Sequence, residues 1–291
     1  MYQIILIYLI CSPISIIGSG FIITTWGLFA KLKHSGSNFI FFQSISDLLF
    51  TLKYIMTVIL YYAAPSIVQF DDSLQPSGSS AVCFMLGMYG QFWGQATVMW
   101  SFMMTVKVFI SFFYTNNTES SESIKWYHLF VWGFCGMNAV IIAAFDQYGP
   151  SSNGCWIVRG NNPFRLFELI PLYITITVSI CILVLILWKI KQKRPTLLMP
   201  NESVKYKIQE REFRNQLLKF ILIFVIFWTP PTILRTMEYM GIEKSFFVYL
   251  DAVSVSSQAL ANSIVWGTSP QFFKLLRRKL RGGPEDEALI Q

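Results

Sequence analysis

Charged side chains inside long apolar stretches are the residues of this sequence best suited to chemistry. Asp47 follows two serines, Ser44 and Ser46, and Lys53 comes six residues later. A carboxylate beside hydroxyl groups can bind a cation or water, or act as a structural hub of hydrogen bonds, and the sequence leaves both open. Because a helix turns by about 100° per residue, Lys53 points away from the Asp47 face, and we expect no direct pairing.

A second group of charged residues lies at the ends of apolar stretches. Such residues can line a pocket for a polar ligand, although mixed charges also occur at helix ends without any binding role. The candidates for ligand binding are Arg159, Arg165, Glu168, Arg235, Glu238 and Asp251.

No residue pattern in the sequence is typical of catalysis or of metal binding. There is no Gly-rich phosphate loop after a strand and no His/Cys spacing of a metal site. The two histidines, His34 and His128, are far apart, and the stretch from Phe246 to Thr268 lacks a lysine that could carry a retinal Schiff base. We therefore expect neither an enzyme nor a bound metal or cofactor.

Composition indicates that these residues are positioned by membrane-spanning helices. The chain of 291 residues is 54% hydrophobic and only 13% charged, whereas soluble domains carry about 25% charged residues. A helix needs about 20 mostly apolar residues to cross a bilayer, and seven such runs occur. We predict an all-α membrane protein with spans at Ile4–Phe29, Phe39–Tyr62, Cys83–Tyr114, Ile124–Phe145, Phe167–Trp188, Leu217–Thr236 and Phe246–Thr268.

The distribution of basic residues predicts the orientation of the bundle. Most of the 23 Lys and Arg residues lie in the gaps on one side of the predicted spans or after the last span. Basic residues next to spans stay in the cytoplasm, so we expect the N-terminus outside and the C-terminus inside. Since the basic residues lie between apolar blocks, we do not expect nucleic acid as a partner.

Two of the five cysteines fall on the outer side of this topology. Cys83 opens the third span, and Cys155 lies in the outer loop after the fourth. Both face an oxidising compartment, which permits a disulfide, with two free thiols as the alternative. A bridge would fix the loop over the mouth of the bundle.

The sixth span has features of a moving helix. Trp228 is followed closely by Pro230 and Pro231, and proline inside a helix removes a backbone hydrogen bond and bends the helix. Either the kink lets the inner half of this helix swing, or the kink is static.

The inner ends of the third and sixth spans are basic. Lys107 comes 24 residues after Cys83, which places it about 36 Å from the outer end of its helix. We expect it to face a cytoplasmic partner, with a lysine reaching the lipid headgroups as the alternative. The charged stretch from Lys205 to Lys219, which includes Arg211 and Arg214, predicts an amphipathic extension of the sixth helix into the cytoplasm.

The chain divides into three parts. Residues 1–268 form the bundle, residues 269–281 an amphipathic helix, and residues 282–291 a short acidic tail. Ser269-Pro270 is typical of a helix start. We expect this helix to lie on anionic lipid, because basic residues surround an apolar face formed by Phe272, Phe273, Leu276 and Leu280.

The seven spans, the expected outer bridge, the proline-containing sixth span and the amphipathic eighth helix together resemble a G-protein-coupled receptor. Within that superfamily the residues look most like the cyclic-AMP receptor family of slime moulds and its plant and protist relatives. The motifs are Ser46-Asp47-Leu48-Leu49, then Cys83, Gly87, Phe92 and Trp100, His128-Leu129-Phe130-Val131-Trp132-Gly133, Gly154-Cys155-Trp156, and Ala261-Asn262-Ser263-Ile264-Val265-Trp266-Gly267.

The sequence departs from the rhodopsin-like class of receptors. Thr105-Val106-Lys107 stands where that class has Asp-Arg-Tyr, and Asn-Pro-x-x-Tyr is absent from the seventh span. We group Asn262 of this span with Asp47 as an intramembrane polar core.

The resemblance implies a receptor in the plasma membrane that senses a small extracellular ligand, either cyclic AMP or another small metabolite. It also implies activation of a heterotrimeric G protein, here by an outward swing of the sixth helix. The competing hypothesis is a seven-helix transporter or ion-coupled carrier, with Asp47 and Lys53 as its intramembrane charges.

Overall fold

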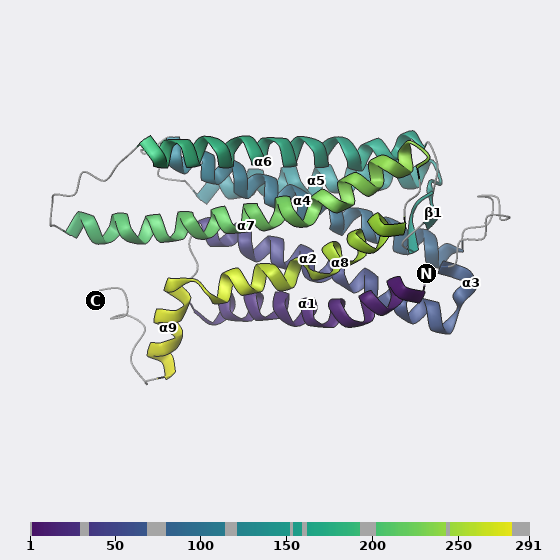
Figure 1. Ribbon diagram of the computed structural model, residues 1–291, viewed down its shortest axis with the longest axis horizontal. Coiled ribbons are helices and arrows are strands. Elements are labelled where there is room, and N and C mark those ends of the chain that lie inside the picture. The colour runs from purple at the N-terminus through teal and green to yellow at the C-terminus, as the bar shows by residue number, and fades with distance from the viewer. Residues whose placement is uncertain are drawn as a thin grey trace.

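The computed structural model describes residues 2–29, 35–68, 80–113, 121–151, 154–158, 162–192, 202–242 and 245–280. Within them, seven long helices run roughly along one axis as a single bundle (Figure 1). These helices are α1 (Tyr2–Leu28), α2 (Ser35–Ala63), α4 (Ala81–Phe113), α5 (Ser121–Ala144), α6 (Leu166–Gln192), α7 (Glu202–Tyr239) and α8 (Ser245–Gly267).

The predicted seven-helix membrane fold is confirmed. By length and apolar composition, six of the described helices are able to cross a membrane, and α8 is the long helix that falls short. The reason is that α8 carries polar residues on a buried face, among them Asp251, Gln258 and Asn262. These side chains face the interior of the bundle, so α8 is less apolar than a helix exposed to lipid on most sides.

The sixth long helix, α7, differs most in its bounds from the predicted span. It begins at Glu202, whereas the apolar run begins at Leu217. The charged stretch therefore continues the same helix, as the sequence indicates. Pro230 and Pro231 lie inside α7, which continues past them to Tyr239.

A short hairpin near one end of the bundle is the one departure from an all-helical chain within the described residues. Strand β1 (Tyr148–Ser151) pairs antiparallel with β2 (Gly154–Ile157), and Tyr148 lies opposite Ile157. Gly154 has a φ of +105°, a conformation that glycine adopts without strain. Two four-residue strands are too short for an alternating apolar pattern to predict them.

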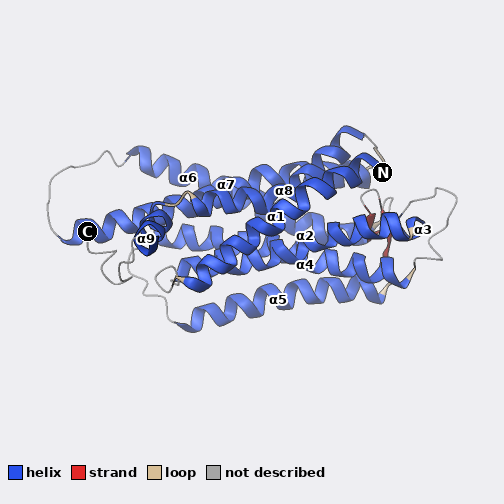
Figure 2. Cartoon of the chain, turned by 90° about the horizontal axis from the view of Figure 1, so that it is seen from below, coloured by secondary structure: helices blue, strands red, loops and turns tan. Residues whose placement is uncertain are grey.

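The two ends of the bundle carry different elements. The N-terminus, the hairpin and the one-turn helix α3 (Pro65–Val68) lie at one end, and α9 (Pro270–Leu280) lies at the other (Figures 1 and 2). We call the first the outer end, in agreement with the charge distribution along the sequence. A 3₁₀ turn at Pro163–Arg165 leads into α6 at this outer end.

The amphipathic helix α9 packs against the inner end of α1. The Phe272 ring lies edge-on to Phe21 and to Phe29, with centroids 5.4 Å and 6.1 Å away. Leu275 is buried beside it, whereas Phe273, which we expected on the apolar face, is 55% exposed. The face of α9 that packs on the bundle is therefore formed by Phe272 and Leu275, and Phe273 is left exposed beside it. The acidic tail lies outside the described residues.

Two large clusters of buried side chains form most of the core within the described residues. The outer cluster includes Tyr8, Phe50, Tyr54 and Trp228, and the inner cluster is built around Trp100 and neighbouring aromatic residues. Helix α4 contributes to both and packs against α2, α5, α6 and α7. The outer cluster forms the floor and walls of the site described next.

Candidate ligand-binding site

A pocket lies in the outer half of the bundle, among α2, α4, α6, α7, α8 and the hairpin. The empty space within it, including the part that is open to solvent, is about 440 Å³. Four of its lining residues carry charge, namely Lys53, Glu168, Arg235 and Asp251, and four are aromatic, namely Phe50, Tyr54, Trp156 and Trp228.

Three of the six candidates for ligand binding line this pocket: Glu168, Arg235 and Asp251. Arg165 and Glu238 lie beside it and bind each other, and Arg159 lies outside the described residues. The candidates predicted from the sequence therefore include three of the four charged residues that line this pocket.

Arg165 is occupied by the protein itself. Its side chain is fully buried, and Nη1 lies 2.6 Å from Oε2 of Glu238 on α7. Its Nη2 donates to the carbonyl of Ile157 at 3.2 Å, and its Nε donates to the carbonyl of Val158 at the same distance. Arg165 thus ties the hairpin and the start of α6 to the outer end of α7.

Arg235 connects three elements. Its Nη1 donates to Oε2 of Glu238 at 3.1 Å, and its Nη2 lies 3.6 Å from Oδ2 of Asp251 on α8. Its guanidinium carbon lies 4.2 Å from the ring centroid of Trp156 in the hairpin, a cation–π contact. Since Arg235 has two carboxylate partners, its charge is already balanced.

A chain of hydrogen bonds fixes the orientation of Glu168. The indole N–H of Trp156 donates to Oε1 of Gln91 at 2.7 Å, and Nε2 of Gln91 donates to Oε2 of Glu168 at 2.8 Å. Gln91 and Trp156 were not among the predicted site residues. A glutamine in an apolar span and a tryptophan in the outer loop do not by themselves indicate a binding site, and their hydrogen bond forms only when these segments pack together.

Lys53 is a further pocket residue that was not among the predicted ligand-binding candidates. It lines the pocket from α2, and only 6% of it is exposed. Gly90 on α4 makes room for it, because a Cβ there would lie 2.5 Å from Cδ of Lys53. As expected, Lys53 does not pair with Asp47. The available signal was the presence of a lysine at membrane depth.

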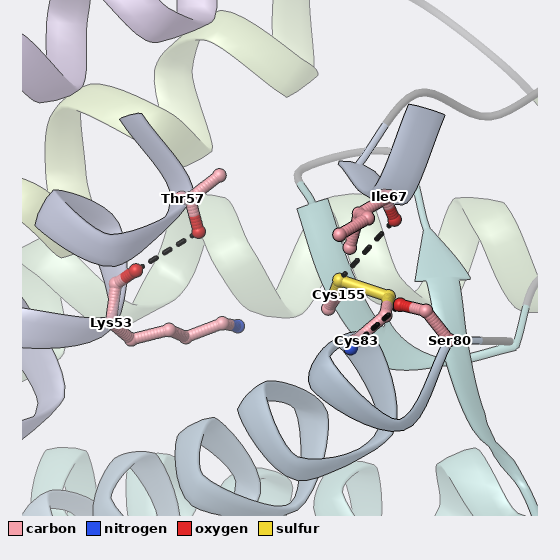
Figure 3. Close-up of a disulfide and its surroundings, with 6 residues drawn as sticks. All are labelled: Lys53, Thr57, Ile67, Ser80, Cys83 and Cys155. Carbon is pink, nitrogen blue, oxygen red and sulfur yellow. Dashed lines mark hydrogen bonds between the residues drawn. A yellow bond between two sulfur atoms is a disulfide. The ribbon is translucent and has the colours of Figure 1, made fainter. Parts of the chain in front are cut away.

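The disulfide between Cys83 and Cys155 is confirmed, with a Cα–Cα distance of 5.2 Å. It joins the first turn of α4 to β2, next to Ile67 of α3. Figure 3 shows the bond, with the Lys53 side chain reaching away from α2 nearby. Trp156 directly follows Cys155, so the disulfide holds the aromatic wall of the pocket in place.

The structure brings the two residues of the predicted polar core together. Nδ2 of Asn262 on α8 donates to Oδ2 of Asp47 on α2 at 2.9 Å, and both side chains are buried. The residues are 215 positions apart in the chain. Their bond joins two helices in the middle of the bundle.

The proline segment of α7 is part of the pocket wall. Pro231 and Trp228 both line the pocket. Hydroxyl groups around the prolines bond to the preceding turn: Thr229 donates to the carbonyl of Val225, and Thr232 to that of Trp228, both at 2.6 Å. Prolines 230 and 231 have no N–H to offer to the carbonyls four residues earlier.

The residues that we expected to face a cytoplasmic partner lie at the inner end of the bundle. Lys107 is half-buried, six residues before the end of α4. Lys205, Arg211 and Arg214 lie in the first turns of α7, and their side chains lie outside the part of the chain that is described.

Comparisons with known proteins decide the family. Residues 1–261 match the model of the family described as 7 transmembrane receptor (Secretin family). Cyclic AMP receptor-like protein F of Dictyostelium discoideum is 58% identical over 99% of this chain and 97% of its own length. This chain belongs to the cyclic AMP receptor-like family of G-protein-coupled receptors.

Two further similarities agree with this assignment. Cyclic AMP receptor-like protein A of Dictyostelium discoideum is 27% identical over 90% of this chain and 63% of its own length. Squid rhodopsin superposes with a TM-score of 0.66 over 97% of this chain and 85% of that one, at 15% identity. The second similarity shows the fold alone. Membership of a receptor family favours the receptor hypothesis over the carrier hypothesis.

Proposed function

We propose that this cyclic AMP receptor-like protein senses a small extracellular ligand in the outer pocket and activates a heterotrimeric G protein at its inner end. One observation carries the proposal. Helix α7 lines the pocket with Trp228, Pro231 and Arg235, and the same helix runs without a break from Glu202 at the inner end. A ligand that displaces α7 in the pocket therefore acts on a helix that reaches the cytoplasm.

The contacts of α7 indicate which part of it moves. The outer end is held by Glu238, which binds Arg165, and by Arg235, which binds Asp251. The two prolines remove backbone hydrogen bonds one turn below these contacts. Movement therefore falls on the inner part, which swings outward about the proline segment. A ligand produces this change only if it binds the swung state more tightly than the resting state.

The proposed partner surface lies where the swing opens the bundle. The partner surface we propose comprises Lys107 on α4 and the segment of α7 that contains Lys205, Arg211 and Arg214. A groove of this kind accepts a helix of the partner. We assign the protein to the plasma membrane, since its ligand is extracellular, and α9 to the inner lipid surface. The names of two relatives make cyclic AMP the first ligand to test.

Guanine-nucleotide exchange tests this function. The purified chain in nanodiscs is mixed with a panel of heterotrimeric G proteins, with cyclic AMP, with a small-metabolite extract, or alone. We expect exchange above that of empty discs with at least one G protein. The triple variant Lys205→Ala, Arg211→Ala, Arg214→Ala should lose it, because the partner surface is altered far from the pocket.

The absence of exchange would overturn the proposal if the protein is folded. Folding is checked by an intact disulfide between Cys83 and Cys155 and a cooperative thermal transition. Uptake of a substrate by cells that lack G proteins, abolished in Asp47→Asn, would instead support the carrier alternative.

A further inference from the structure

The cations at the outer end differ in what already neutralises them. Arg165 is paired with Glu238, and Arg235 is paired with both Glu238 and Asp251. Among the described residues, no carboxylate lies within ion-pair distance of Nζ of Lys53, and no hydrogen bond to that nitrogen is formed. The centroid of the Tyr54 ring lies 5.7 Å from Nζ. Lys53 is thus the cation of the pocket wall that remains available to a ligand.

A buried ammonium group without a partner is costly, which argues that it serves binding and not stability. Arg235 repels this group, and Asp251 and Glu168 attract it only from beyond ion-pair distance. The neighbouring Gly90 leaves space for the lysine side chain, since any larger residue would displace it. The packing of α2 against α4 therefore holds this charge at the pocket.

The carboxylates of the pocket differ in the same way. Asp251 lies 3.6 Å from Arg235, whereas Glu168 has no ion pair within the described part of the chain. One oxygen of Glu168, Oε2, accepts a hydrogen bond from Gln91, and this contact fixes the direction of the carboxylate. Glu168 on α6 is therefore the anion available to a ligand, just as Lys53 is the available cation.

The formal charges of the lining balance, with Lys53 and Arg235 against Glu168 and Asp251. A ligand with a single negative charge would meet Lys53 but would also bring its charge near Glu168. A ligand with a single positive charge would be repelled by Lys53 in the same manner. A ligand that carries both charges satisfies both residues, and aromatic rings such as Tyr54 and Trp228 suit its cationic end.

We propose that the pocket binds a small zwitterion, whose anionic group contacts Nζ of Lys53 and whose ammonium group contacts the carboxylate of Glu168. This inference rests on the proposed function in so far as the outer pocket is the ligand site. It narrows the ligand class, because a singly charged anion such as cyclic AMP satisfies Lys53 alone.

A series of ω-amino acids tests the inference in nanodiscs containing the full chain. The probes are glycine, β-alanine, 4-aminobutanoate and 6-aminohexanoate, and affinity is read from tryptophan fluorescence, since Trp156 and Trp228 line the pocket. Butanoate and butylamine match 4-aminobutanoate in carbon number but carry one charge each. We expect at least one ω-amino acid to bind about 30-fold more tightly than either single-charge probe or cyclic AMP, the ratio expected for one additional buried charge pair.

Variants separate the two contacts. Lys53→Met should abolish binding of the ω-amino acids, and Glu168→Gln should reduce it to the level of butanoate. Gly90→Ala should weaken binding, because its Cβ would lie 2.9 Å from Nζ of Lys53 and displace the ammonium group without removing its charge. Gly133→Ala is the matched control, since nothing lies within 4 Å of its Cβ.

The thermal midpoint of each variant without ligand shows whether a loss of binding is due to misfolding. Lys53→Met should raise the thermal midpoint, since it removes a buried charge that has no partner. Arg165→Met should lower the midpoint, because that guanidinium is fully paired.

The inference is overturned if no probe of the series binds, or if binding persists in Lys53→Met. Nucleotide exchange separates this inference from the proposed function. If a zwitterion binds without causing exchange, the receptor function is wrong and the zwitterion site stands. If cyclic AMP alone causes exchange, the receptor function stands and the zwitterion site is wrong.

Discussion

Arg165 and Glu238 form a buried ion pair across 73 residues of sequence, with Nη1 and Oε2 2.6 Å apart. The pair joins the start of α6, which also holds the hairpin through backbone carbonyls, to the last turn of α7. The same oxygen of Glu238 accepts from Arg235. Through Arg165, the carboxylate of Glu238 thus connects the hairpin to α7, the helix that we propose to move.

Glu238→Gln should destabilise the protein strongly. The substitution keeps the shape of the side chain but leaves the buried guanidinium of Arg165 without a counter-charge, and breaking such a pair costs about 3–5 kcal/mol. The thermal midpoint in nanodiscs measures the effect. Asp146→Asn is the matched control, because Asp146 is exposed at the same end and asparagine tolerates its φ of +54°. Equal midpoints for the two variants would contradict the structural role of the pair.

Removal of the disulfide should loosen the pocket as well as lower stability. Cys83 and Cys155 are 72 residues apart, and the loss of a native disulfide typically costs about 2–5 kcal/mol. The double variant Cys83→Ala, Cys155→Ala should lower the thermal midpoint and increase iodide quenching of tryptophan fluorescence, since Trp156 loses its anchor. Cys181→Ala, at a free cysteine on α6, should change neither quantity. An unchanged quenching profile in the double variant would show that other contacts alone hold the hairpin.

The helices could be predicted from the sequence because a span depends on local features, and the disulfide because it depends on the order of the spans. A run of about 20 apolar residues defines a span by itself. Once the spans are counted, Cys83 and Cys155 fall on the same side of the membrane. The continuation of α7 before Leu217 also followed from sequence, since the charged stretch contains good helix formers and no proline between Glu202 and Leu217.

The pocket forms where segments that are distant in the sequence pack together. The helical periodicity of the sequence does not show which faces of two helices meet. Helical spacing correctly turned Lys53 away from Asp47, but it could not say that this face meets Gly90 of α4. Arg165 was expected to face a ligand, and the structure uses it to hold a hairpin whose strands are too short to predict. The sequence therefore identified charges at the outer end without distinguishing those that are paired from those that remain available.

The hydrogen bond between Asn262 and Asp47 should matter more than the charge of Asp47. Asn262→Leu removes the donor of this hydrogen bond to a buried carboxylate, which costs about 1.5–3 kcal/mol. Asp47→Asn keeps an oxygen that accepts from Asn262, so it should cost less. Thermal midpoints with sodium or choline as the only cation separate the two interpretations of Asp47. A stabilisation by sodium that disappears in Asp47→Asn would favour a cation site over a hydrogen-bond hub.

The prolines of α7 should be required for signalling but not for folding. Pro230→Ala together with Pro231→Ala restores two N–H donors one turn above the carbonyls of Ile226 and Phe227, which stiffens the segment about which α7 swings. We expect nucleotide exchange to fall several-fold, with the amount of protein at the cell surface retained and the thermal midpoint equal or higher. Pro13→Ala is the matched control, since Pro13 also lies inside a membrane-spanning helix, α1, but not in the pocket wall. If exchange is unchanged in the double variant, or falls equally in Pro13→Ala, the inner part of α7 does not swing about this segment, and the pocket must reach the cytoplasm through another helix.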